Sequence, residues 1–175
     1  MAKAVFCIAR GRAQAEDIVN ALKDSGFSNN DISVLFPDQE GTRDFAHEQH
    51  TKAPEGASMG AAAGGVTLGA LGWLVGIGSL AIPGLGPFIA AGPILAALSG
   101  AAVGGALGGL AGGLIGMGMP EYEAKQYEGK IKEGNILISV HAEHSGEISR
   151  AKEIFQNAGA EDISCTGESA VPHRQ

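Results

Sequence analysis

The stretch NILISVHAEHSGEISRAKEIFQNAGAEDISCT, residues 135–166, contains the pattern that decides the fold of this 175-residue chain. Its first six residues, Asn135–Val140, are mostly apolar and rich in β-branched side chains, which is typical of a buried strand. Glu147–Asn157 has apolar side chains at helical spacing, and Gly159 supplies a helix stop. Asp162–Thr166 has the pattern of a second strand. The stretch therefore predicts a β-α-β unit.

A second β-α-β unit lies at the N-terminal end of the chain. Ala4–Ala9 (AVFCIA) is a predicted buried strand, and Ala13–Ser25 is a predicted helix that ends at Gly26. Asp31–Phe36 (DISVLF) is the second predicted strand, and it begins with the same Asp-Ile-Ser as the last strand of the other unit. Two such units on one sheet predict an α+β, ferredoxin-like domain whose right-handed crossovers place helices on one face.

Charge is confined to the two flanks of the sequence. All 31 Asp, Glu, Lys and Arg residues lie in residues 1–55 and 121–175, and residues 56–120 have none. Each flank is more acidic than basic, and the net charge is −7. Sequence-independent nucleic-acid binding requires clustered Lys and Arg to neutralise phosphates, so this composition argues against a nucleic-acid partner.

The uncharged segment holds 20 of the 28 glycines, and many of them recur every four residues. Residues four apart lie on one face of a helix, so glycines at this spacing form a groove in which another backbone can approach closely. We therefore predict helix packing and oligomerisation at seven glycines: Gly60, Gly64, Gly100, Gly104, Gly108, Gly112 and Gly116.

Prolines divide the uncharged segment into two arms, Ala57–Ile82 and Pro93–Met119. As α-helices the arms would each be ~40 Å long, which exceeds the ~30 Å hydrocarbon core of a bilayer. Lipid keeps even glycine-rich segments helical because an unpaired backbone group there costs several kcal/mol. The sequence thus predicts an antiparallel α-helical hairpin inserted into the domain, with Pro83, Pro87 and Pro93 at its turn.

The sequence does not decide what surrounds the hairpin. It could span a bilayer, dip into one leaflet or pack against other subunits, because Gly and Ala contribute little insertion energy and the hairpin tip is uncharged. If the hairpin contacts lipid, we expect the lipid bilayer to be a partner and the protein to lie at the inner or plasma membrane, with its α/β domain in the cytoplasm. Burial between subunits predicts a cytoplasmic ring, shell or filament. A homo-oligomer is expected in either case.

The predicted organisation follows from these patterns. It has a first β-α-β half, a polar linker, the hairpin, a connecting helix, a second β-α-β half and a tail, at residues 1–36, 37–55, 56–120, 121–134, 135–168 and 169–175. In the connecting helix, Tyr122, Lys125 and Lys132 are of types that occur at a lipid headgroup boundary, and a solvated helix is the alternative.

Two histidine pairs are candidate metal ligands. His47 and His50 are three residues apart, as are His141 and His144, and such a pair can share a helix face. Neither pair forms the HExxH motif, and His141 falls at a strand end, so solvated polar loops are the favoured interpretation.

Two cysteines, Cys7 and Cys165, fall on the first and last predicted strands, which are neighbours in a ferredoxin-like sheet. A thiol pair is geometrically possible there, although small buried apolar side chains are the favoured interpretation. The sequence offers no catalytic constellation and no phosphate-binding loop. We therefore expect neither enzymatic activity nor a cofactor.

Three runs of the chain resemble bacterial general-stress and low-temperature-induced proteins. They are TRDFAHEQHTKAPEGA (Thr42–Ala57), LAIPGLGPFIAAGP (Leu80–Pro93) and GMGMPEYEAKQYEGKIKEGNILISVH (Gly116–His141). The resemblance covers nearly the whole chain and implies a stress-related, membrane-associated protein, with no catalytic residues to carry over.

The function that we expect from the sequence is non-enzymatic. The hairpin would anchor the protein in a membrane and mediate self-association, and the cytoplasmic α/β domain would be an interaction platform. Two alternatives remain: a soluble homo-oligomeric structural assembly with buried hairpins, and a sensor that binds a small ligand in the ferredoxin-like domain.

Overall fold

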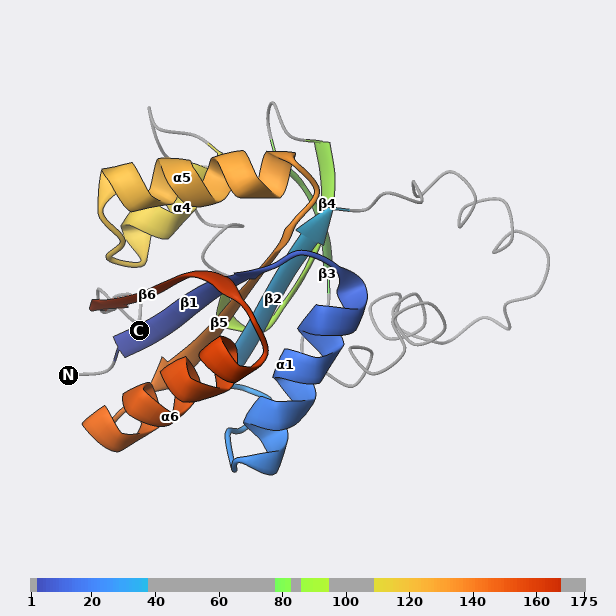
Figure 1. Ribbon diagram of the computed structural model, residues 1–175. Helices are drawn as coiled ribbons and strands as arrows, with labels where there is room; N and C mark the ends of the chain where they lie inside the picture. Colours follow the sequence, from blue (N-terminus) through green and yellow to red (C-terminus); the bar gives the residue numbers. More distant parts are fainter. Residues whose placement is uncertain (1–2, 38–77, 83–85, 95–108, 168–175) are drawn as a thin grey trace, which may run out of the picture.

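The computed structural model describes residues 3–37, 78–82, 86–94 and 109–167, and Figure 1 shows these parts in colour. The elements follow one another as β1 (Lys3–Ala9), α1 (Arg12–Asp24), β2 (Ile32–Pro37), β3 (Gly78–Ile82), β4 (Gly86–Ala91), α4 (Leu110–Gly116), α5 (Glu121–Lys132), β5 (Ile136–Ala142), α6 (Ser145–Asn157) and β6 (Glu161–Gly167). The protein is therefore of the α+β class, as predicted.

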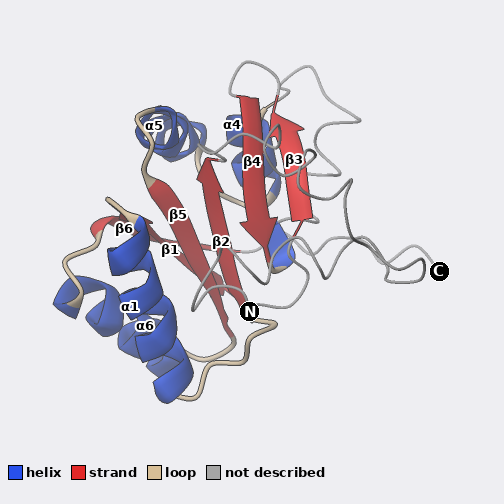
Figure 2. Ribbon diagram, turned by 90° about the vertical axis from the view of Figure 1, so that its right-hand side faces the viewer, coloured by secondary structure: helices blue, strands red, loops and turns tan. Residues whose placement is uncertain are grey.

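The strands form one sheet of six in the order β3-β4-β2-β5-β1-β6, and every neighbouring pair is antiparallel. Strands β1, β2, β5 and β6 come from the two predicted β-α-β stretches and lie side by side, with β5 between β2 and β1 (Figures 1 and 2). The four strands and two helices predicted in these stretches are confirmed, with ends that differ by one or two residues.

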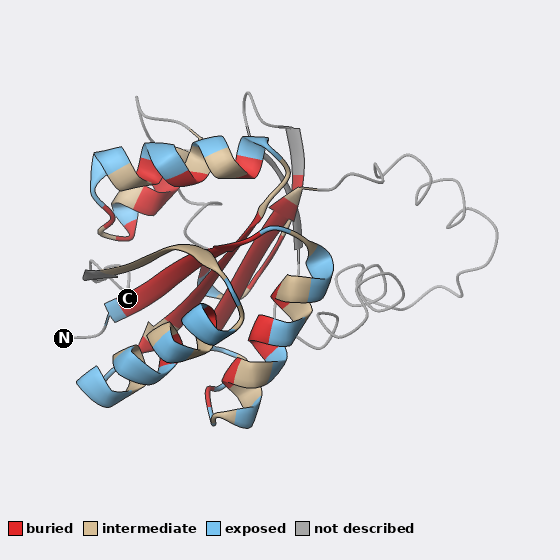
Figure 3. Ribbon diagram, viewed as in Figure 1, coloured by how far each residue is buried: buried red, intermediate tan, exposed pale blue. Residues whose placement is uncertain are grey.

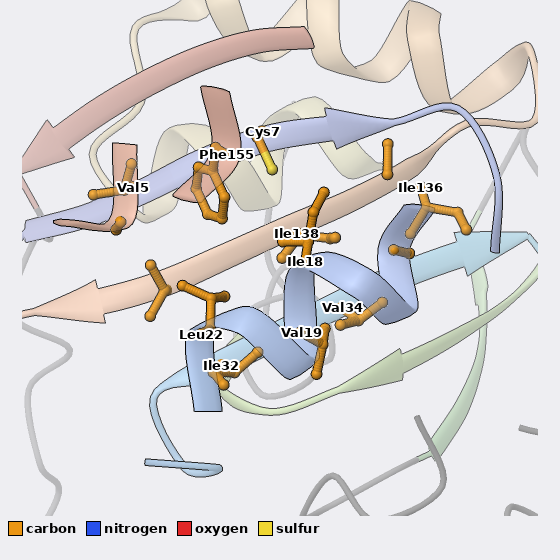
Figure 4. Packing of buried hydrophobic residues seen from close by; sticks show 14 of the residues in the cluster. Val5, Cys7, Ile18, Val19, Leu22, Ile32, Val34, Ile136, Ile138 and Phe155 are labelled. Carbon is orange, nitrogen blue, oxygen red and sulfur yellow. The ribbon is translucent and has the colours of Figure 1, made fainter. Parts of the chain in front are cut away.

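One face of the sheet is covered by α1 and α6 (Figure 2). Val5, Cys7 and Ala9 of β1 point to this face and pack with Ile18 of α1 and Phe155 of α6, which are fully buried (Figure 4). The alternation follows from strand geometry, since successive side chains point to opposite faces. We call this apolar cluster the first layer.

The opposite face is covered by α4 and α5, which the sequence did not lead us to expect. The intervening residues of β1, such as Phe6 and Ile8, point to this face and pack with Leu114 of α4 and Tyr127 of α5. Both faces of β1 are apolar, and a strand of this kind requires a cover on each side. We call this cluster the second layer, and Figure 3 shows the buried inner side of α5.

Two stretches of the predicted helical hairpin, residues 78–82 and 86–91, are β-strands, which corrects the prediction for these residues. Gly78–Ile82, expected at the end of a helical arm, forms β3, and Gly86–Ala91, expected at the helical turn, forms β4. The physical reason is tertiary. Strand β2 pairs with β5 along one edge. Along its other edge it pairs with β4, from Val34↔Ala91 to Pro37↔Phe88. A sheet edge satisfies the backbone of an extended segment as well as a helix does.

Strand β4 also contributes apolar side chains to both layers. Phe88 and Ala90 are buried in the second layer, while Ala91 is buried in the first and Ile89 packs against it. In the second predicted arm, Pro93 and Ile94 are helical and α4 covers Leu110–Gly116. The rest of the two arms, residues 57–77 and 95–108, lies outside the described residues.

Candidate functional site

The predicted glycine ladder is described at two of its seven positions. Gly112 and Gly116 lie in α4, Gly112 half-buried and Gly116 exposed. A Cβ built on Gly116 meets nothing within 4 Å, so this position leaves room beside the helix. Gly60, Gly64, Gly100, Gly104 and Gly108 lie outside the described residues. Their role in helix packing stays a prediction.

The three prolines assigned to the hairpin turn have different positions. Pro87 lies within β4 opposite Ala81, so it is part of a β-strand and not of a helical turn. Pro93 is exposed and begins the helical residues after β4, in keeping with the helix start expected there. Pro83 lies outside the described residues.

Gly92, between β4 and Pro93, is a position that sequence reasoning missed. Its φ of +83° is in the left-handed region, and a Cβ there would lie 2.2 Å from the carbonyl oxygen of Ile32. Immediately afterwards, the Ile94 N–H donates to Oγ of Ser33, a buried hydroxyl, at 3.2 Å. Glycine therefore allows the chain to leave β4 in close contact with β2.

The C-terminal histidine pair lies at the junction of β5 and α6. The N–H of His141 donates to the Asp31 carbonyl at 2.8 Å, which ties the end of β5 to the start of β2. The N–H of His144 donates to the Glu147 carboxylate at 3.3 Å, and the N–H of Glu143 donates to the same group at 2.8 Å. These bonds keep the pKa of Glu147 below its usual value, partly opposed by desolvation. Glu147 thus organises the N-terminal end of α6.

His47 and His50 lie outside the described residues, so a metal site that needs both histidine pairs stays a prediction. Within residues 3–37, 78–82, 86–94 and 109–167, no group of three or more His, Cys, Asp and Glu side chains is placed to hold a metal ion.

The cysteines lie on adjacent strands and are both free thiols. Cys165 is opposite Val5 in the β1–β6 register, which puts it two residues out of line with Cys7. Cys7 is completely buried in the first layer, and this desolvation raises the pKa of its thiol. Cys165 is half-buried against the same layer.

Helix α4, at the end of the glycine-rich segment, packs against the domain. Leu110 and Leu114 are fully buried in the second layer, and Met117 and Met119 follow them into it. The preceding residue, Gly109, has φ +103° and no side chain with which to cap the helix. We call the packing of Leu110–Met119 against the sheet and α5 the α4 dock.

A carboxylate from α5 supplies the missing cap. The N–H of Ala111, in the first turn of α4, donates to Oε2 of Glu128 at 3.0 Å, and Lys132 pairs with Oε1 of the same carboxylate at 2.9 Å. Desolvation opposes ionisation of Glu128, but the bonds from Lys132 and Ala111 outweigh it and lower its pKa. The charged carboxylate therefore fits the positive N-terminal end of α4.

A row of polar contacts, which we call the α5–β6 seam, holds α5 on the sheet. The hydroxyl of Tyr127 donates to the carbonyl oxygen of Asp162, and Nε2 of Gln126 donates to its Oδ1 at 3.0 Å. Farther along, Oγ of Ser164 donates to Oε2 of Glu123 at 2.5 Å. Burial raises the pKa of Tyr127, with smaller contributions from nearby acidic groups, so the phenol stays a neutral donor.

An ion-pair cluster ends this seam. Glu161 of β6 pairs with Arg10, and its Oε2 lies 3.5 Å from Nζ of Lys130 in α5. Next to it, Asp162 has a φ of +50°, where β6 shifts its register against β1. Asp is one of the few residue types other than Gly that adopts this conformation readily. Local sequence patterns contain no signal for these pairs, because their members are at least 31 residues apart.

The outer face of α5 carries the three residues predicted for a headgroup boundary. The Tyr122 side chain is 81% exposed, and among the described residues it is the only large hydrophobic one that is exposed. Lys125 pairs with Glu121 at 2.7 Å, while Lys132 pairs with Glu128. The outer face of α5 therefore has an exposed aromatic ring and two ion pairs.

Comparison of the chain with protein-family models, with curated proteins and with solved structures finds no match. The class that the fold and the site define is thus an α+β protein with an antiparallel sheet covered on both faces. Among its described helices, none is both long enough and apolar enough to cross a membrane.

Proposed function

We propose that this chain is a non-enzymatic, membrane-associated stress-response protein. Its α/β domain is a cytoplasmic platform, and the uncharged glycine-rich residues outside the described parts contact lipid and other copies of the chain. The observation that carries the proposal is the complete lack of charge over residues 56–120 in a chain with 31 charged residues elsewhere. The stress role rests on the family resemblance in three runs of the sequence.

The platform in this proposal is a ferredoxin-like core. The order β2-β5-β1-β6 supports it, because two β-α-β units that interlock in one antiparallel sheet give this arrangement. The hairpin of β3 and β4 extends the core at the β2 edge, and α4 with α5 covers the face that the two crossover helices leave open.

The attachment of the first uncharged run limits how it can enter a bilayer. Residues 56–77 precede β3, and the chain before them continues from β2, so both ends return to one sheet. A segment that leaves and rejoins the same domain must cross a bilayer an even number of times. As a helix this run would be ~33 Å long, enough for one crossing of a ~30 Å core but not for two.

The second uncharged run is more limited still. It connects Ile94 to Leu110, and both residues are buried in the second layer. The intervening 95–109 would be ~22 Å long as a helix, which is less than one crossing. We therefore propose that the uncharged runs enter one leaflet and return, in place of a hairpin that spans the membrane.

Self-association is the second part of the proposed function. Glycines four residues apart favour close helix contact in lipid, where small residues and not apolar burial drive packing. Gly60→Leu with Gly64→Leu should reduce the size of the membrane-extracted oligomer. Ala61→Leu is the matched control, because it adds the same side chain beside the ladder. An equal oligomer size for both variants would remove self-association from the proposal.

The test of membrane contact uses Trp73, the single tryptophan, which lies in the first uncharged run. With vesicles of phosphatidylethanolamine and phosphatidylglycerol, its emission should shift to shorter wavelength as the ring enters an apolar environment. Leu71→Asp with Val75→Asp should abolish the shift and release the protein from membranes at alkaline pH. Gln39→Asp with Gln49→Asp adds the same charges to the polar linker and should leave both properties unchanged.

Two results would count against the proposal. If the Leu71→Asp, Val75→Asp variant binds vesicles as the parent does, the uncharged run is not the contact. Recovery of the parent from cells as a large particle without detergent would favour the alternative, a soluble homo-oligomeric assembly.

A further inference from the structure

The outer face of α5 carries one large apolar side chain. Tyr122 is 81% exposed, whereas the inner side of the same helix buries Ala124, Tyr127 and Ile131 in the second layer. Figure 3 shows the exposed outer side along the helix. A tyrosine ring is typical of the centre of a protein–protein contact, because it has a large apolar area and a polar tip. The ring by itself does not indicate what covers it.

Gly129 lies two helical turns farther along the same face. Residues seven apart point in nearly the same direction, so Tyr122 and Gly129 belong to one exposed stripe of α5. The φ of Gly129 is outside the left-handed region, and a Cβ built on it would meet nothing within 4 Å. Glycine weakens a helix interior, and among the described residues neither conformation nor packing requires it here. The position leaves an open space beside the helix, two turns from the ring.

Charges on one flank of this stripe alternate in sign. Spaced three or four residues apart, they are Glu121, Lys125, Glu128 and Lys132. The first turn of α5 is therefore acidic and its last turn basic. Two copies of α5 in parallel would place each charge beside its own copy. An antiparallel pair places the acidic first turn of one copy beside the basic last turn of the other, so the charge pattern fits a second, antiparallel copy.

We propose that the outer face of α5 is a homodimer interface, in which the Tyr122 ring of each copy packs over Gly129 of the other. A two-fold axis between Lys125 and Gln126 makes both contacts at once, because positions 122 and 129 are equally distant from it. With no side chain at Gly129, the ring has room against the helix backbone. This interface lies on a described, charged helix, so it does not rest on the glycine ladder or on contact with lipid.

The interface is small. Helix α5 has 12 residues and is ~18 Å long. Interfaces that bury less than about 1,200 Å² are typical of weak and transient complexes, so we expect the dimer population to rise with protein concentration. Tyr122→Ala should raise the dissociation constant of the dimer by about tenfold or more, the usual effect of truncating a central aromatic side chain.

Disulfide cross-linking of the full chain tests the arrangement. Lys125→Cys with Cys165→Ser has one accessible thiol, since Cys7 is buried. In the proposed dimer the two copies of position 125 are ~1.5 Å apart along the helix direction, so oxidation with copper phenanthroline should give a covalent dimer. Glu133→Cys with Cys165→Ser is the control for direction. Its two copies would be ~22 Å apart along the helix, so this variant should stay monomeric.

A second pair of variants tests the contact itself. Gly129→Leu fills the space that the ring needs, and it should lower the cross-linked yield of the Lys125→Cys variant by about tenfold at low protein concentration. Gly146→Leu is the matched control. It adds the same side chain to an exposed helical glycine of α6, where a Cβ also meets nothing within 4 Å, on the other face of the sheet. It should leave the yield unchanged, and circular dichroism checks that each variant is folded.

Three results would overturn the proposed dimer. They are the absence of a cross-link in the Lys125→Cys variant at every concentration, equal cross-linking of Glu133→Cys, and an unchanged yield in Gly129→Leu. If no cross-link forms and Tyr122→Ala weakens sedimentation with vesicles of phosphatidylethanolamine and phosphatidylglycerol, this face contacts lipid and not a second copy.

The glycine ladder variant separates this interface from the proposed function. A cross-link that persists when Gly60→Leu and Gly64→Leu are added supports an α5 contact that forms without the ladder. Its loss in that variant would make the cross-link a consequence of ladder association, and the α5 interface would be rejected. Failure of the α5 cross-link leaves the Trp73 measurement of lipid contact unaffected, so the two proposals fail separately.

Discussion

The N–H of Ala111 in α4 donates to Oε2 of Glu128 in α5 at 3.0 Å, across a sequence separation of 17 residues. The bond joins an uncharged glycine-rich helix to a helix with alternating charges, and it satisfies a donor that Gly109 leaves without a side-chain partner. The same carboxylate accepts Lys132. The Glu128 side chain thus adds a polar contact to the apolar packing of α4 on the α/β domain.

The stability of the domain should depend on pH through Glu128. Its pKa is lowered in the folded protein, so the folded state holds the proton less tightly than the unfolded state does. Glu128 therefore makes its full contribution to the free energy of unfolding above the unfolded pKa of about 4.3. This contribution is lost as the pH falls through the pKa of Glu128 in the folded protein. Urea unfolding should show Glu128→Gln to be less stable than the parent at pH 7, with a difference that narrows below about pH 4.

Other carboxylates make the comparison with the parent essential. The pKa of Glu161 is also lowered, chiefly by its hydrogen bond from Arg10, so acid weakens every variant to some extent. Glu133→Gln, at the end of α5, is a suitable control because it changes the same charge outside the α4 dock. A constant difference between Glu128→Gln and the parent from pH 7 to pH 3 would contradict the assignment of the cap.

Phe88 should be a core residue and not part of a membrane-embedded turn. It is 2% exposed, lies in β4 and packs in the second layer with α4 and α5. Phe88→Ala should lower the free energy of unfolding by about 3–5 kcal/mol, the usual loss for a buried phenylalanine. Urea unfolding measured by circular dichroism tests this. Pro93→Ala, at an exposed neighbour, should cost far less, and equal stability of both variants would contradict the pairing of β4 with β2.

The Tyr127 hydroxyl should stabilise the α5–β6 seam. Tyr127→Phe keeps the buried ring, 6.3 Å from that of Phe6, and removes the bond to the carbonyl of Asp162. A partly buried carbonyl that loses its donor is costly, so we expect a loss of about 1–2 kcal/mol in thermal or urea unfolding. Tyr122→Phe removes the same atom from an exposed ring on the same helix and should have no measurable effect. Equal losses in the two variants would show that the seam bond contributes nothing.

The two thiols should react at very different rates. Cys7 is fully buried with a raised pKa, whereas Cys165 is half-buried on the edge strand β6. The thiolate is the reacting form, so a thiol reagent such as Ellman's reagent should modify about one thiol per chain in the native protein and two after unfolding. Cys165→Ser should leave almost no fast reaction. Rapid modification of both thiols in the native parent would contradict the burial of Cys7.

Much of the domain was predictable because its signals are local. Ala4–Ala9 is apolar at every position and Asn135–Val140 is mostly apolar, and the helices after them carry apolar residues at helical spacing. The type and the order of these elements can therefore be predicted from short stretches of sequence. The Asp-Ile-Ser at Asp31 and Asp162 was the basis for the prediction that the two halves are related. The helix at 121–132 was expected for the same reason, since its residues are strong helix formers.

The glycine-rich segment was harder to predict, because its local signal is ambiguous. Residues 86–91 (GPFIAA) fit a buried strand or an apolar helix equally well, and periodicity does not separate the two for short apolar runs. Proline and glycine punctuation was interpreted as a helical turn. In the structure it bounds β-strands, and the deciding factor is an unfilled sheet edge at β2, which no window of sequence contains.

The amino-acid sequence by itself determined which residues are apolar, where charge stops at Glu55 and resumes at Glu121, and how the two β-α-β halves are ordered, because each property depends on residue identity and near neighbours. Only the tertiary structure decided that Phe88 and Leu114 share one core and that Glu128 caps α4. Those contacts join residues 17 or more positions apart, and they form only once strand pairing has built the sheet whose two faces the helices cover.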